Sequence, residues 1–194
     1  LYTTCLSCKL EKFICELIIV RTRLIMKKDF LSILDFSAKE VLSTLELAEK
    51  LKLELKTKGE NEKILSGKSL VMLFEKPSLR TRLSFEVGMS QLGGHALYLA
   101  PEDIKFGTRE AIKDFGQVLS RYLDALVIRT FSHQQLEELA ATCTIPVING
   151  LTDLSHPCQV LADLYTIKEK KANLSGINLT YIGDGNNVVH SLLY

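Results

Sequence analysis

A run of basic and hydroxyl side chains, FEKPSLRTRLSFE, spans residues 74–86 and begins where an apolar segment ends. Within it, Ser78, Arg80 and Thr81 follow Pro77 at the predicted start of a helix. The first amides of a helix lack intrahelical acceptors and lie at the positive end of its dipole, so these side chains favour an anion such as phosphate. Residues two apart on a helix diverge, so we expect Arg82 to serve the structure. The alternative is an exposed basic turn without a ligand.

Two further places carry groups suited to an oxyanion or a carbonyl oxygen. Arg129, in the run VIRT, lies at the end of an apolar predicted strand, where a buried charge needs a partner, either a ligand or an acid such as Asp153. In SHPCQ, Pro157 at the first helical position leaves His156 as the N-cap and Gln159 in the first turn. The helix dipole should lower the pKa of His156 and keep the ring neutral, able to donate to a carbonyl oxygen. A histidine that only caps the helix is the alternative.

A fourth motif, IGDGNN, offers a tight turn and an amide. Gly183 and Gly185 allow the turn, and Asn187 can present its side chain to a substrate carboxylate or amine. The motif lacks the G-x-G-x-x-G spacing, and no Walker loop is present, so nucleotide binding is a weak reading.

The elements that must position these residues alternate along the chain. Ser37 and Glu40 form a capping box before an amphipathic pattern, and short apolar runs separate further helical patterns. This order predicts an α/β fold, a parallel sheet flanked by helices, with ligands at the carboxyl ends of its strands. The expected strands are 69–74, 95–100, 125–130, 146–149 and 179–184, and the expected helices are 37–56, 77–92, 110–122, 133–142, 156–171 and a last one from about 187.

Three segments are expected along the chain. The polar run KEKKANLSG starts at Lys168 and marks a boundary, so residues 26–171 form one domain and residues 172–194 begin a second α/β domain. Residues 1–25 precede Met26 and are expected to be an upstream extension that is not native structure.

Composition narrows the function classes. The 24 basic and 23 acidic residues nearly cancel, which argues against nucleic-acid or anionic-membrane partners. The longest apolar stretch near the start is far shorter than the ~20 residues of a membrane span. Five cysteines in irregular spacing argue against a disulfide framework and for a reducing compartment, with the cytoplasm as the expectation.

Together the motifs resemble the aspartate/ornithine carbamoyltransferase family over about residues 26–194. FEKPSLRTRLSFE is similar to the family's carbamoyl-phosphate motif, VIRT to its later arginine, and HPCQ to its histidine and glutamine pair. INGLTDLSHPCQVLADLYTI and IGDGNNVVHS are closer to the ornithine branch than to the aspartate branch.

The resemblance implies a role for each candidate residue. The catalytic set around the carbamoyl group would be Arg129, His156 and Thr81, and Asn187 would touch ornithine. A loop of the neighbouring subunit would be PEDIKFGTRE, in which Lys105 replaces the family's glutamine, and Leu79 replaces a commoner threonine. The carbamoyl-phosphate contacts implied in this way are Ser78, Leu79, Arg80, Thr81, Lys105, Arg129, His156 and Gln159.

The activity implied is transfer of the carbamoyl group of carbamoyl phosphate to the side-chain amine of L-ornithine, giving L-citrulline and phosphate in arginine metabolism. It needs no metal, cofactor or protein nucleophile, and the family is usually a homotrimer. The family's later aspartate, serine-methionine-glycine loop and cysteine-leucine-proline motif do not occur before Tyr194, so we expect a truncated chain with little turnover. The alternatives are another amine, namely aspartate, putrescine or acetylornithine, and a non-catalytic carbamoyl-phosphate-binding module.

Overall fold

The computed structural model describes residues 27–100 and 111–194. The expected extension at 1–25 and the loop that holds Lys105 lie outside the described residues. Strand and helix alternate as the sequence predicts up to α6. The elements are η2 (Ile33–Asp35, a 3₁₀ turn), α2 (Ala38–Lys58), β1 (Ser69–Phe74), α3 (Leu79–Gln91), β2 (His95–Leu99), α4 (Ile112–Tyr122), β3 (Ala125–Arg129), α5 (His133–Thr142), β4 (Val147–Leu151), α6 (Pro157–Lys171) and α7 (Asn187–Leu192).

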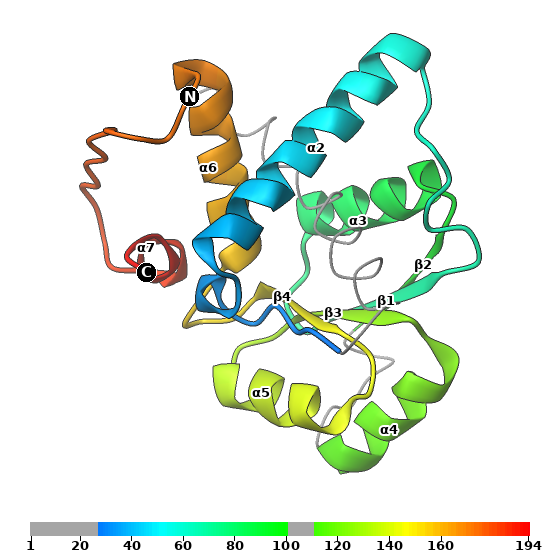
Figure 1. Ribbon diagram of the computed structural model, residues 1–194. Helices are drawn as coiled ribbons and strands as arrows, with labels where there is room; N and C mark the ends of the chain where they lie inside the picture. Colours follow the sequence, from blue (N-terminus) through cyan, green and yellow to red (C-terminus); the bar gives the residue numbers. More distant parts are fainter. Residues whose placement is uncertain (1–26, 101–110) are drawn as a thin grey trace.

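The four strands form one parallel sheet in the order β2-β1-β3-β4. Phe74 at the end of β1 lies opposite Arg129 at the end of β3, and Arg129 lies opposite Leu151 at the end of β4. The register between β3 and β4 shifts between Ile128 and Arg129. The segments that leave β1, β3 and β4 therefore start side by side at the carboxyl end of the sheet (Figure 1). They carry three of the four predicted motifs.

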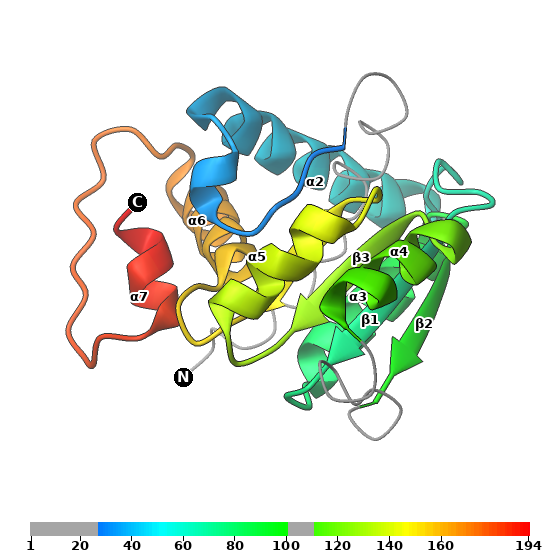
Figure 2. The same ribbon diagram turned by 90° about the horizontal axis from the view of Figure 1, so that it is seen from below.

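Helices cover both faces of the sheet, as predicted. One face packs against α2, α3 and α6, and the other packs against α4 and α5 (Figures 1 and 2). The alternation within β1 shows why, since Leu70 and Met72 belong to the first core and Val71 and Leu73 to the second. None of the helices in the described ranges is both long enough and apolar enough to cross a membrane.

The contact between α4 and α5 depends on a glycine. A Cβ atom at Gly116 would lie 2.2 Å from Thr142 Oγ1 and 3.2 Å from Cys143 Sγ. Contacts below 3.0 Å require something to move, so a side chain at this position would displace the Thr142 side chain or the end of α5 that carries it.

The β4 edge of the sheet is covered by the segment before η2. Phe30 forms a parallel bridge with Ile148, its amide donates to the Val147 carbonyl at 2.9 Å, and its carbonyl accepts from the Asn149 amide at 2.9 Å. Phe30 is fully buried. This one-residue extension of the sheet was not predicted, because a single bridging residue leaves no period in the sequence.

The predicted strand at 179–184 is wrong. Residues 172–186, which follow α6, contain neither helix nor strand, and they arch away before the chain returns at α7 (Figures 1 and 2). The side chains of Leu179 and Ile182 are 60% and 93% exposed. A parallel strand needs a neighbour to accept its hydrogen bonds, and the described residues place none beside this segment. The domain boundary at residue 171 remains a prediction.

Candidate active site

The start of α3 is the first part of the candidate site. Ser78 is the N-cap, so the helix begins at Leu79, two residues later than expected, and Pro77 lies outside it. The Ser78 hydroxyl accepts weakly from the Thr81 amide at 3.4 Å and donates to Thr81 Oγ1 at 3.0 Å. The first turn contains no acidic side chain. The positive end of the helix is therefore not neutralised from within the first turn, and the Arg80 side chain is exposed above it.

Arg82 has the structural role expected for it. Its Nε donates to Glu86 Oε1 at 2.9 Å, and its guanidinium lies 4.0 Å from the centroid of the Tyr98 ring. These contacts attach α3 to β2 and direct the Arg82 side chain away from the helix start.

The segments after β1, β3 and β4 are braced against one another. The Glu75 amide donates to the Arg129 carbonyl at 2.8 Å, and the Thr130 hydroxyl donates to the Glu75 carboxylate. Asp153, considered above as a partner of Arg129, forms its ion pair with Lys76. These contacts fix the position of Arg129 relative to the α3 start. The sequence contained no signal for them, because each joins residues more than 50 positions apart.

Lys76 also contacts an aromatic ring. Its ammonium lies 4.1 Å from the centroid of Phe131, which directly follows β3 and Thr130. A cation over an aromatic face adds a weak attraction that also shields the aliphatic part of the lysine. Lys76 therefore connects the segments that leave all three strands.

His156 is the buried part of the site. It is the N-cap of α6 with Pro157 at the first helical position, as predicted, and it is 7% exposed. Burial, with a further contribution from the Arg129 charge, lowers the pKa of His156 from 6.5 to about 3. The direction was predicted correctly, but burial rather than the helix dipole is the main cause. The ring is neutral at pH 7, and Arg129 lies within electrostatic reach of it.

The Nδ1 nitrogen of the His156 ring is a buried polar atom. Nδ1 is buried, and within the described part of the chain no group forms a hydrogen bond with it. A buried polar atom of this kind costs free energy unless a ligand or an ordered water completes its bonding. His156 Nδ1 can therefore accept or donate one further hydrogen bond, within electrostatic reach of Arg129.

The other predicted residues are more peripheral in the structure. Gln159 Nε2 donates to Asp163 Oδ1 at 2.9 Å, one turn further along α6. Asn187 Nδ2 donates to the Thr152 carbonyl at 2.7 Å, so its amide reaches the loop between β4 and α6. Lys105 lies outside the described residues. The structure thus places Ser78, Arg80 and Thr81 after β1. Arg129 is at the end of β3, and His156 follows β4.

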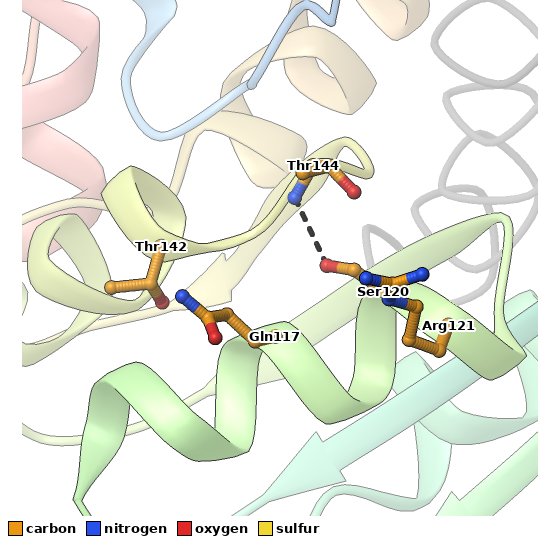
Figure 3. Close-up of a pocket in the computed structure, with 5 residues that line it drawn as sticks. All are labelled: Gln117, Ser120, Arg121, Thr142 and Thr144. Atoms are coloured by element: carbon orange, nitrogen blue, oxygen red, sulfur yellow. Dashed lines mark hydrogen bonds between the residues drawn. The ribbon is translucent and has the colours of Figure 1, made fainter.

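A polar hollow of about 550 Å³ lies at the other end of the sheet, near the amino ends of β3 and β4 (Figure 3). It is lined by Gln117, Ser120, Arg121, Thr142 and Thr144 at the ends of α4 and α5. The Ser120 hydroxyl is already bonded to the Gly116 carbonyl and the Thr144 amide, and Thr142 Oγ1 donates to Leu139. The carboxyl ends of helices disfavour anions, so this hollow does not compete with the α3 start as a phosphate site. Among the described residues, no three metal-binding side chains gather closely enough to hold a metal ion.

Comparison with known proteins identifies the family of the chain. Residues 28–169 match the aspartate/ornithine carbamoyltransferase family in its carbamoyl-phosphate-binding domain. The chain belongs to this family. The resemblance carried by FEKPSLRTRLSFE, VIRT and HPCQ is thereby confirmed at the level of the family.

Individual relatives extend the match. The chain is 58% identical to the ornithine carbamoyltransferase of Anoxybacillus flavithermus over 166 residues, covering 86% of this chain and 52% of that protein. It is 54% identical to that of Methanoculleus marisnigri over 168 residues, covering 87% and 54%. The crystal structure of ornithine carbamoyltransferase from Thermus thermophilus superposes with a TM-score of 0.78 at 42% identity, covering 87% of this chain and 57% of that one.

The match to a second solved structure is stronger. Ornithine carbamoyltransferase from Pyrococcus furiosus gives a TM-score of 0.84 at 50% identity, covering 87% of this chain and 53% of that chain. The chain thus spans about half the length of the relatives it matches. The matched half is the carbamoyl-phosphate-binding domain of this family.

Proposed function

We propose that this chain is the carbamoyl-phosphate-binding half of an ornithine carbamoyltransferase, an enzyme that converts carbamoyl phosphate and L-ornithine to L-citrulline and phosphate. The observation that carries the proposal is the juxtaposition of an anion-ready helix start with a neutral, buried His156 beside Arg129 at the carboxyl end of the sheet. The relatives at 50–58% identity that share this domain are named ornithine carbamoyltransferases, which supports ornithine as the amine.

The α3 start is the proposed phosphate site. The main-chain amides of Leu79, Arg80 and Thr81 lie in the first turn, with the Ser78 and Thr81 hydroxyls beside them. The Arg80 guanidinium adds a charged donor suited to phosphate oxygens. These donors stabilise phosphate as it becomes the leaving group. Lys105, from the loop of a neighbouring subunit, is proposed to reach the same phosphate.

Arg129, His156 and Thr81 are the proposed donors to the carbamoyl oxygen, with Gln159 beside the carbamoyl amide. As the ornithine amine nitrogen bonds to the carbonyl carbon, negative charge develops on that oxygen, and fixed donors lower the barrier. The bond from carbon to the phosphate oxygen then breaks. A neutral His156 can donate one ring N–H there without carrying a charge of its own.

The amine needs positioning and a proton acceptor. Asn187 is the proposed contact of ornithine, because it is at the start of α7 and already reaches the loop before His156. The departing phosphate accepts the proton released by the amine, so no protein base is required. Holding both substrates in one cleft supplies much of the remaining rate.

A homotrimer is the proposed assembly of the full-length protein. Leu79, Leu83 and Val87 follow one another at four-residue intervals on α3, and all three are exposed. An exposed apolar helix face of this kind is typical of a protein interface. It begins at the proposed phosphate site, which we expect the neighbouring subunit's loop to reach, so a second copy of this chain is the partner we propose.

We further propose that the protein works in arginine metabolism, in a reducing compartment, namely the cytoplasm. Cys143 and Cys158 are both buried, and Cys158 Sγ donates to the Asn149 carbonyl at 3.2 Å. Burial raises the pKa of the Cys143 thiol, which disfavours the reactive thiolate. Thiols of this kind suit a compartment that keeps them reduced.

Carbamoyl-phosphate binding by two neighbouring arginine variants tests the proposal. Arg80→Ala removes the exposed guanidinium at the helix start, and we expect the Kd measured by titration calorimetry to rise by about 100-fold, because a charge-assisted contact is worth ~1.5–3 kcal/mol. Arg82→Ala is the matched control, since Arg82 is bound to Glu86 and Tyr98. Its Kd should change by about threefold or less. Unchanged affinity in Arg80→Ala would show that the phosphate binds elsewhere.

A further inference from the structure

The short helix α7 packs against the loop that carries His156. Asn187 Nδ2 donates to the Thr152 carbonyl at 2.7 Å, and His190 Nδ1 lies 3.0 Å from the Leu154 carbonyl oxygen. The His156 amide donates to Ser191 Oγ at 2.9 Å. Three side chains of one helix thus contact three successive parts of the loop between β4 and α6.

Ser191 is the buried member of this set. It is 2% exposed, and its hydroxyl donates to the Asn187 carbonyl at 2.8 Å while accepting from the His156 amide. His156 is the N-cap of α6 and makes no side-chain capping bond. The Ser191 hydroxyl therefore satisfies a buried amide that precedes the helix and fixes the backbone from which the imidazole projects.

One hydroxyl thereby joins two residues of different proposed roles. Asn187 is the proposed ornithine contact, and His156 is the proposed donor to the carbamoyl oxygen. Their connection runs through two hydrogen bonds, from the His156 amide to Ser191 and from Ser191 to the Asn187 carbonyl. A displacement of α7 would be transmitted to the histidine backbone along this path.

We propose that Ser191 is a positioning residue, whose hydroxyl sets the orientation of His156 toward the carbamoyl group and couples it to the ornithine side of the site. This inference rests on the proposed function for its ligand, but its structural half concerns this chain alone. It predicts that loss of the hydroxyl changes recognition of the carbamoyl group without changing recognition of phosphate.

The first experiment needs no ligand. In the ¹⁵N-labelled chain, Ser191→Ala should speed exchange of the His156 amide with solvent by about tenfold or more, since its buried acceptor is lost, and should shift the His156 ring signals. Ser191→Cys keeps the volume and replaces oxygen with a poor acceptor, so it should act in the same direction if the alanine variant folds badly.

The matched control is Ser120→Ala at the other end of the sheet. Ser120 Oγ accepts from the Thr144 amide at 2.9 Å (Figure 3). It also donates to the Gly116 carbonyl, four residues earlier, at 2.7 Å, so it accepts and donates as Ser191 does. The control should speed exchange of the Thr144 amide and leave the His156 signals unchanged.

The second experiment compares two ligands by titration calorimetry. In Ser191→Ala the Kd of carbamoyl phosphate should rise by about tenfold, while the Kd of inorganic phosphate should stay within about twofold of the native value. Ser120→Ala should alter neither. A merely structural role would weaken both ligands together.

The outcomes separate the two proposals. Unchanged His156 signals in both Ser191 variants, equal weakening of both ligands, or equal weakening by Ser120→Ala would overturn the positioning role. If the native chain bound neither ligand while the His156 signals still responded to Ser191→Ala, the proposed function would fail and the effect of Ser191 on His156 would stand.

Discussion

At the scale of single residues, the site depends on the contrast between an exposed arginine and a buried histidine. Arg80 is on the surface of the first turn of α3, where water can exchange with an arriving phosphate. His156 is enclosed beside Arg129, and its ring is kept neutral by burial. In the proposed complex, the two ends of carbamoyl phosphate would meet different environments: a charged side chain near solvent for the phosphate, and a buried neutral donor for the carbonyl.

The lowered pKa of His156 makes a prediction about stability and pH. The folded pKa of about 3 is below the unfolded value of 6.5, so the unfolded chain binds more protons between these pH values. Stability from this residue is therefore complete above about pH 6.5 and falls as the pH decreases toward 3. At pH 5 the native protein should have lost about 2 kcal/mol through this residue, since one pKa unit corresponds to ~1.36 kcal/mol.

Urea unfolding of the native protein and His156→Gln between pH 7.5 and pH 5 measures this contribution. The variant should lose about 2 kcal/mol less over this range, because it has no ring to protonate. His95→Gln, at an exposed histidine, controls for the substitution itself. Parallel curves for the native protein and His156→Gln would mean that the ring is not held neutral.

At the scale of elements, the close approach of α4 and α5 makes a second prediction. Gly116→Ala should lower the free energy of unfolding by about 1–3 kcal/mol, because the new Cβ atom would lie 2.2 Å from Thr142 Oγ1. Alanine is intrinsically better than glycine in a helix by ~1 kcal/mol, so a loss would report crowding alone. Thermal unfolding gives the value, with Gly185→Ala as control, since no atom lies within 4 Å of a Cβ there. Equal or greater stability of Gly116→Ala would contradict this packing.

The sequence predicted the elements best where their periodicity was strong. The capping box of Ser37 and Glu40 and the buried run of β1 both carry local patterns, and both are present. The strand predicted at 179–184 failed because an apolar run becomes a strand only when a neighbour accepts its hydrogen bonds. The bridge between Phe30 and Ile148 was missed for a different reason, because a single residue that joins the sheet leaves no pattern in the sequence.

Some residues of the candidate site could be predicted from the sequence, whereas the contacts between distant residues could not. Ser78, Arg80 and His156 could be selected because their residue types follow strand ends directly in the sequence. Partners across the fold could not, and so Asp153 was considered for Arg129 although its ion pair is with Lys76. The link from Ser191 to His156 was missed for the same reason, because 35 positions separate them.

At the scale of the whole molecule, we expect transfer of the carbamoyl group to need parts of the relatives that this chain does not match. The chain covers about half of its relatives, and the predicted ornithine contact Asn187 is close to its last residue. The proposed phosphate and carbamoyl contacts, by contrast, all precede α7 in the sequence. Binding of carbamoyl phosphate and transfer of its carbamoyl group should therefore be separable.

Citrulline formation measures that separation. The present chain should bind carbamoyl phosphate and form little citrulline from ornithine. A chain extended to the length of its relatives should form citrulline from ornithine at least ~100-fold faster than it forms the corresponding product from aspartate or putrescine, since a site built for one substrate's polar groups rejects analogues strongly. If the extended chain formed product mainly from another amine, ornithine would be the wrong substrate. If it formed product from no amine, the proposed enzyme activity would be wrong and a carbamoyl-phosphate-binding module would remain.

The irregular segment 172–186 has one further consequence. A helix of six residues, the length of α7, is too short to persist alone in water. The segment is therefore a tether that keeps α7 at high local concentration above the loop of His156. A single proteolytic cut within it would break the covalent link between α6 and α7, and the orientation of the histidine would then depend on the hydrogen bonds of α7 alone.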